Sequence, residues 1–141
     1  MITTMATKRA TAIMDTAPEP GCFRVMKTNG LIGGMSWEFT VSYYRLINTA
    51  VKEKLGGLHS AKCVLYSVDF AEIEVLQQEA RWGEATQVLA AAGQSVERAG
   101  AYLALLCTNT MHKVAEALQG SRVPLFDTTR IHALVAVKYA F

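Results

Sequence analysis

The feature of the sequence that most constrains its fold is a regular alternation of short apolar runs and longer segments with helical periodicity. Apolar runs of strand length occur at residues 28–32, 61–68, 101–106 and 123–126. Between them, apolar residues recur at steps of three and four, as in amphipathic helices. This alternation indicates crossover connections between parallel strands. We therefore predict an α/β fold: a three-layer sandwich with a mostly parallel sheet of about four strands.

Five helical segments are expected. The first should begin after Ser36, a residue type that caps helices, and end at Gly56. Its expected inner face consists of Trp37, Val41, Tyr44, Ile47, Val51 and Leu55. The other helices are expected at 71–78, 84–98, 109–119 and 127–139. For the third and fourth helices, the expected inward residues are Val88, Leu89, Ala92, Val96, Met111, Val114, Ala115 and Leu118.

A chain of 141 residues suits one domain, which we place at residues 26–141. Residues 1–25 show no steady period and are interpreted as a loose tail. One interpretation of the tail is an extension from an upstream start codon, with Met26 as an alternative start. The other is a transit peptide, which the basic residues near its start favour and its acidic residues oppose.

Composition excludes several classes of protein. The chain is 51% hydrophobic and 18% charged, as expected for a globular protein, and its net charge of +2 is too small to indicate nucleic-acid binding. No apolar run approaches the roughly 20 residues of a membrane span, and the N-terminus lacks the apolar core of a signal peptide. The three cysteines are widely spaced, which argues against a disulfide framework or a metal site. We expect a cytoplasmic protein with reduced thiols.

Chemistry is expected where strands end, because parallel α/β sheets bind ligands at the carboxyl ends of their strands. At one such end, an apolar run leads directly into Cys107, Thr108, Asn109 and Thr110. A helix is expected to start there, and its dipole should lower the pKa of the Cys107 thiol. The polar residues that follow could hold a carboxylate. The alternative is that Cys107 is a small buried apolar residue.

Five segments of the sequence, taken together, resemble aspartate/glutamate racemases. They are Gly-Leu-Ile-Gly-Gly-Met-Ser-Trp-Glu at 30–38, Tyr-Tyr-Arg-Leu-Ile-Asn at 43–48, Gly-Gly-Leu-His-Ser-Ala at 56–61, Ser-Val-Asp-Phe at 67–70 and Cys-Thr-Asn-Thr-Met-His-Lys at 107–113. The segments occur in the family's order and spacing, and the resemblance covers about residues 26–118.

The resemblance implies a cofactor-independent amino-acid racemase, commonly a homodimer, whose substrate is a small amino acid. In this family two cysteines on opposite faces of the substrate exchange the α-proton, and Cys107 matches one of them. The positions that match substrate-binding residues are Met35, Gln77, Thr108, Asn109 and Thr110. Of these, residues 108–110 match the cradle for the α-carboxylate.

The sequence departs from the family in its second half. No Gly-Cys-Thr-Glu motif, which carries the second cysteine, occurs in the 141 residues, whereas 123–133 resemble the family's C-terminal end. We therefore expect a single lobe of the two-lobe racemase fold, formed by 26–118 with a returning strand and helix at 123–141. Cys63 is expected to be structural, so activity should be impaired. A carboxylate-binding lobe without turnover and an inactive remnant are the alternatives. Asn29, where the family has an apolar residue, is expected to be costly if buried without a partner.

Overall fold

The computed structural model of the chain describes residues 26–108, 111, 114 and 122–126. The strands are β1 (Asn29–Gly33), β2 (Cys63–Ser67), β3 (Leu103–Leu106) and the two-residue β4 (Leu125–Phe126). They form one sheet in the order β2-β1-β3-β4, in which every pair is parallel. The predicted parallel sheet is confirmed, and each predicted apolar run overlaps one strand.

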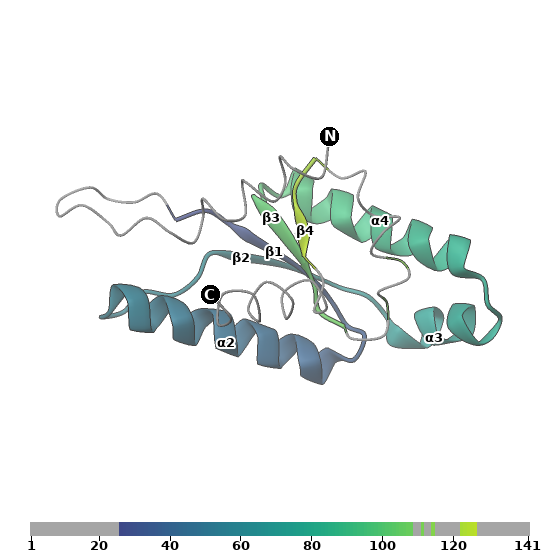
Figure 1. Ribbon diagram of the computed structural model, residues 1–141, viewed down its shortest axis with the longest axis horizontal. Coiled ribbons are helices and arrows are strands. Elements are labelled where there is room, and N and C mark those ends of the chain that lie inside the picture. Colours follow the sequence, from purple (N-terminus) through teal and green to yellow (C-terminus); the bar gives the residue numbers. More distant parts are fainter. Residues whose placement is uncertain (1–25, 109–110, 112–113, 115–121, 127–141) are drawn as a thin grey trace, which may run out of the picture.

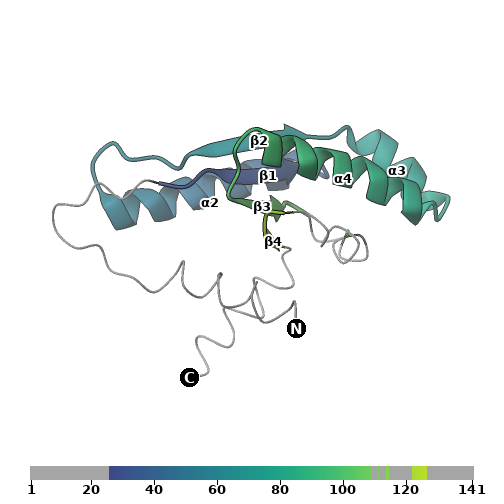
Figure 2. The ribbon, with the colours of Figure 1, turned by 90° about the horizontal axis from the view of Figure 1, so that it is seen from above.

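Helices cover both faces of the sheet, which confirms the three-layer arrangement. The helix α2 (Trp37–Leu55) lies on one face, and α4 (Trp82–Arg98) lies on the other and contacts β1, β2 and β3 (Figures 1 and 2). The helix α3 (Phe70–Gln78) packs beside α4. No helix in the described part of the chain is long and apolar enough to cross a membrane. The predicted tail at 1–25, the helix at 127–139 and most of the helix at 109–119 lie outside the described residues.

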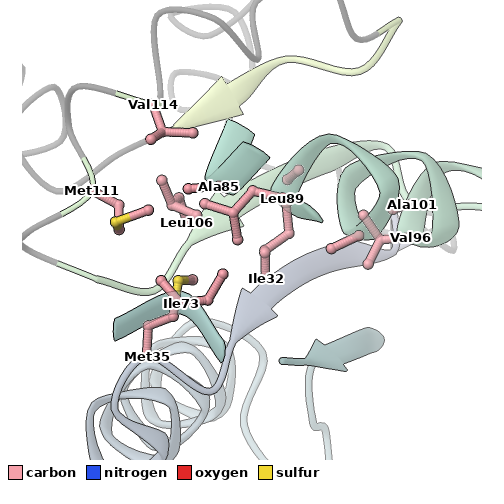
Figure 3. Close-up of a cluster of buried hydrophobic side chains, with 12 residues drawn as sticks. Ile32, Met35, Ile73, Ala85, Leu89, Val96, Ala101, Leu106, Met111 and Val114 are labelled. Atoms are coloured by element: carbon pink, nitrogen blue, oxygen red, sulfur yellow. The ribbon is translucent and has the colours of Figure 1, made fainter. Parts of the chain in front are cut away.

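The hydrophobic core lies between α4 and the sheet (Figure 3). Its buried members are Ile32, Met35, Ile73, Ala85, Leu89, Ala92, Val96, Ala101, Ala104, Leu106, Met111 and Val114. The predicted inward positions Leu89, Ala92 and Val96 are confirmed, and Val88 is half-buried. Met111 and Val114 are buried as predicted, whereas Ala115 and Leu118 lie outside the described residues.

The predicted inner face of α2 is right at Ile47 and Val51, which are half-buried, and wrong at its other four positions. Trp37, Val41 and Tyr44 are 64%, 54% and 50% exposed, and Leu55 is exposed as well. The stripe that faces the sheet is the neighbouring one, in which Thr40 is buried and Tyr43, Ile47 and Val51 are half-buried. Apolar residues cover so much of this helix that their spacing cannot decide which stripe faces the sheet.

Asn29 destabilises the fold less than its position in β1 suggested. The residue is half-buried, and its side-chain Nδ2 donates a hydrogen bond to the carbonyl oxygen of Lys62 at 3.2 Å. The backbone N–H of Asn29 donates to the same oxygen at 2.8 Å. Because the amide has a partner, the penalty for an unpaired buried polar group does not apply.

Candidate functional site

The order of the strands singles out one place on the sheet. From β1 the chain passes through α2 to β2 on one side, then returns through α3 and α4 to β3 on the other side. The connections from β1 and β3 therefore leave these neighbouring strands in opposite directions. In doubly wound sheets, ligands bind at the carboxyl ends of two such strands. Cys107 directly follows β3 at this place, and Met35 lies in the turn after β1.

Backbone hydrogen bonds hold the ends of three strands together. The N–H of Cys107 donates to the carbonyl oxygen of Ile32 at 2.9 Å. The N–H of Val68, which follows β2, donates to the carbonyl oxygen of Gly33 at 2.9 Å. Successive carbonyl groups of β1 thus fix the residues that follow β2 and β3, so the edge of the sheet has a defined geometry.

The turn after β1 requires two glycines. Gly34 has a φ of +98°, and a Cβ at this position would lie 2.1 Å from the carbonyl oxygen of Val68. A Cβ at Gly33 would lie 2.4 Å from side-chain atoms of Thr40. The Thr40 hydroxyl accepts a hydrogen bond from the Gly34 N–H at 3.0 Å and donates one to the carbonyl oxygen of Ser36 at 3.4 Å. The turn is therefore packed between Val68, which follows β2, and Thr40 in the first turn of α2.

Ser36 begins α2 as predicted, but its side chain does not cap the helix. No capping hydrogen bond from Ser36 to the helix backbone is present. A hydrogen bond from Ser36 instead lowers the pKa of the Glu38 carboxyl below its ordinary value. Beside the turn, the sequence thus supplies a carboxylate that stays ionised at neutral pH.

Two predicted substrate-binding residues lie in or against the same hydrophobic core cluster. Met35 is buried, with 3% of its surface exposed, in the same core cluster as Ile73 and Met111 (Figure 3). Gln77, near the end of α3, donates a side-chain hydrogen bond from Nε2 to the sulfur of Met111. The structure therefore brings Met35 and Gln77 to one region from different elements. Met111 itself was expected to be inward, but not to contact Gln77.

The Cys107 thiol does not have the lowered pKa that the sequence predicted. The residue is completely buried, and its Sγ donates to the carbonyl oxygen of Leu105 at 3.7 Å. Burial raises the pKa of this thiol to about 12, because an apolar environment disfavours the charged form. The prediction weighed the helix dipole but not desolvation, and the expected first turn of that helix, at 109–110, lies outside the described residues.

The predicted carboxylate cradle is described only at its first residue. Thr108 is 5% exposed, and its backbone N–H donates to the carbonyl oxygen of Leu106 at 3.0 Å. Asn109 and Thr110 lie outside the described residues, so their role stays a prediction. Cys107, Thr108 and Met35 are all buried. Within the described part, no group of three or more His, Cys, Asp or Glu side chains could hold a metal ion.

Sequence reasoning missed Thr40, although it shares the turn with Met35. No local pattern marked it, because the predicted inner face of this helix passes through Trp37 and Val41 and leaves position 40 outside. A buried polar side chain next to a glycine turn indicates a hydrogen bond to the turn's backbone.

Comparison with known families decides what kind of lobe this is. The sequence profile of the Asp/Glu/Hydantoin racemase family matches residues 32–136. The chain belongs to this family. The match includes the glycine turn, Gln77 and the segment that begins at Cys107, so it spans every predicted site residue.

Solved structures of racemase relatives have the same fold. A proposed Asp/Glu racemase from Yersinia pestis is 56% identical with a TM-score of 0.71, and the match covers 72% of this chain and 45% of that one. An aspartate racemase homologue from Pyrococcus horikoshii OT3 is 32% identical with a TM-score of 0.66, at the same two coverages. This racemase-family chain therefore spans about 45% of the length of either relative.

Proposed function

We propose that this chain is a racemase lobe of the aspartate/glutamate type, in which Cys107 exchanges a proton with the α-carbon of an amino acid. The observation that carries the proposal is the place of Cys107. It follows β3 at the point where the connections from β1 and β3 diverge, in a chain that belongs to the racemase family. Ligands bind at this point in parallel α/β sheets.

The proposed reaction uses two thiols and no cofactor. A thiolate on one face of the substrate takes the α-proton, and a thiol on the other face donates a proton to the α-carbon. The configuration is inverted, and the thiol and thiolate have exchanged places. In the described geometry burial raises the pKa of Cys107 to about 12, so the thiol is protonated at neutral pH. Acid–base catalysis needs a pKa closer to the working pH, so we propose that Cys107 is less desolvated in the catalytic state than in the described geometry.

The substrate's α-carboxylate is assigned to Thr108, Asn109 and Thr110, which offer hydroxyl and amide donors. Met35 and Met111 belong to the same core cluster, and Gln77 binds the sulfur of Met111. The buried side chains of Met35 and Met111 suit the apolar part of a small amino acid better than a second charge. Which acidic amino acid binds depends on residues that are not among these contacts.

We assign the second thiol to a second copy of the chain. Cys63 is level with Asn29 at the start of β1, whereas Cys107 lies four residues beyond Leu103, which is also level with Asn29. Four residues of strand separate the two thiols by roughly 13 Å along the sheet. Cys22 lies outside the described residues. A homodimer that places two copies of Cys107 across one substrate would supply both thiols.

The test is α-proton exchange with L-aspartate and L-glutamate in deuterium oxide, followed as loss of the α-hydrogen signal. We expect exchange with inversion of configuration in the unmodified chain and no exchange in Cys107→Ala. Cys63→Ala, which removes a thiol at the other end of the sheet, should exchange at the unmodified rate. Exchange that persists in Cys107→Ala would contradict the assignment of the thiol. Exchange with retention of configuration would mean that one thiol works alone.

A second candidate function is carboxylate binding without turnover. It is favoured by the single thiol that the described residues place at the site and by the raised pKa of Cys107. Calorimetry distinguishes the two. Saturable binding of aspartate or glutamate by a chain that shows no exchange would support this candidate, and absence of binding at millimolar ligand would rule it out.

A further inference from the structure

Thr40 is the only buried residue of α2, a helix that the structure describes in full. It lies in the first turn of the helix and is 5% exposed. A threonine in a helix commonly donates to the carbonyl group four residues earlier. Thr49 on the same helix does only this: it is exposed, and its hydroxyl donates to the carbonyl oxygen of Arg45 at 2.9 Å. Thr40 has a further partner, so its role is not limited to the helix.

The Thr40 side chain contacts three of the four residues in the turn 33–36. Its hydroxyl accepts from the Gly34 N–H at 3.0 Å and donates to the carbonyl oxygen of Ser36 at 3.4 Å. Its methyl and hydroxyl groups lie 2.4 Å from where a Cβ of Gly33 would be. The fourth residue of the turn is Met35, which stands between the two residues that the hydroxyl binds.

We infer that Thr40 is a positioning residue for the candidate site, because its hydroxyl fixes the turn 33–36 and so holds Met35 beside the Cys107 end of β3. This inference rests on the proposed function, in which Met35 borders the substrate. A hydroxyl is required because the turn presents one donor and one acceptor to the same side chain, and a hydroxyl satisfies both. Without it, the Gly34 N–H would be buried with no acceptor.

Two substitutions separate the hydrogen bonds from packing. Thr40→Val keeps the shape of the side chain and removes the hydroxyl, whereas Thr40→Ser keeps the hydroxyl and removes the methyl group. Thr49→Val is the matched control, since it removes from the same helix a hydroxyl that binds only the helix itself.

The experiment is NMR of the full chain, labelled with ¹⁵N and with ¹³C at the methionine methyl groups. We expect Thr40→Val to speed hydrogen exchange of the Gly34 amide roughly tenfold, as loss of one hydrogen bond implies, and to shift the Met35 methyl resonance. In Thr40→Ser, the Gly34 exchange rate and the Met35 resonance should be those of the unmodified chain. Thr49→Val should change neither of them. If Thr40→Val does not fold, Thr40→Ser still decides, because loss of Gly34 protection in that variant would overturn the inference.

The second readout is α-proton exchange of L-aspartate. We expect the exchange rate of Thr40→Val to be about tenfold lower than that of the unmodified chain. The exchange rate of Thr40→Ser should equal that of the control, Thr49→Val. If the unmodified chain exchanges no proton, the proposed function fails while the Gly34 and Met35 signals still test the role of Thr40. Unchanged Gly34 and Met35 signals in Thr40→Val would overturn the inference even in an active chain.

Discussion

At Cys107 two physical effects compete over one proton. A helix N-terminus and polar neighbours stabilise a thiolate, whereas removal from water destabilises it. In the described structure the thiol is fully enclosed and its acceptor is the neutral carbonyl group of Leu105. Desolvation therefore dominates, and the pKa rises.

The raised pKa of Cys107 predicts how stability depends on pH. The ordinary pKa of a thiol is 9.0 and burial raises that of Cys107 to about 12, so the unfolded chain loses this proton first as the pH rises. Stability should be fully present below pH 9.0 and fall as the pH approaches 12. Urea unfolding from neutral pH to about 10.5 should show a steeper fall for the unmodified chain than for Cys107→Ala.

Cys63→Ala is the control for this pH dependence. Burial also raises the pKa of Cys63, but that residue is only half-buried. Cys63→Ala should therefore reduce the loss of stability at high pH less than Cys107→Ala does. Equal pH dependence in the unmodified chain and Cys107→Ala would mean that the thiol is exposed to water in solution.

The turn after β1 gives a second prediction at the scale of single residues. Gly34→Ala adds a Cβ at a φ of +98° and 2.1 Å from the backbone of Val68. We expect a loss of about 3 kcal/mol, because left-handed strain and overpacking add. Gly57→Ala is the control: its φ is +57° but nothing lies within 4 Å of the added Cβ, so a loss near 1 kcal/mol is expected. Similar urea midpoints for the two variants would show that the clash at Gly34 relaxes.

Among the elements of the fold, strands were the most predictable from sequence. Each apolar run overlaps one strand, and α3 and α4 begin within two residues of their predicted starts. The pattern is informative there because a buried parallel strand is apolar on both faces and short. The orientation of α2 was not predictable, because Trp37, Val41 and Tyr44 form a stripe as regular as the one that faces the sheet.

The same reasoning separates what was predictable in the site. Cys107 stood out because an apolar run changes abruptly to polar residues at a strand's end. Thr40 did not stand out, because a polar residue within a helix is expected to face solvent unless the packing is known. The contact between Gln77 and Met111 joins residues 34 positions apart, and no local pattern encodes it.

The attachment of α2 to the sheet gives a prediction at the scale of elements. Asn48 binds two backbone groups: its Oδ1 accepts from the Ala61 N–H at 2.9 Å, and its Nδ2 donates to the carbonyl oxygen of Tyr44 at 2.9 Å. The first bond ties α2 to the segment that leads into β2. Asn48→Ala should cost about 1–3 kcal/mol in urea unfolding. Asn48→Asp keeps the acceptor for Ala61 and should cost less, and an equal loss in both variants would assign the effect to the Tyr44 bond.

For the whole molecule, the decisive property is that the described residues place one thiol, that of Cys107, at the candidate site. Cys63 is at the opposite end of the strands, and we propose that a second copy of the chain supplies the second thiol. The proposed homodimer then makes activity depend on concentration, because dilution separates the two copies of Cys107. We expect the exchange rate per chain to rise with protein concentration until dimerisation is complete, in parallel with the mass measured by sedimentation.

Mixing experiments test this dependence without changing the total protein concentration. Cys107→Ala chains should dimerise normally, so diluting the unmodified chain with an equal amount of this variant leaves two thiols in about a quarter of randomly formed dimers. Exchange with inversion should therefore fall to about a quarter of the rate of the undiluted chain, since mixed dimers hold only one thiol. A fall to one half would mean that each chain works independently, and the second thiol would then have no place in the mechanism.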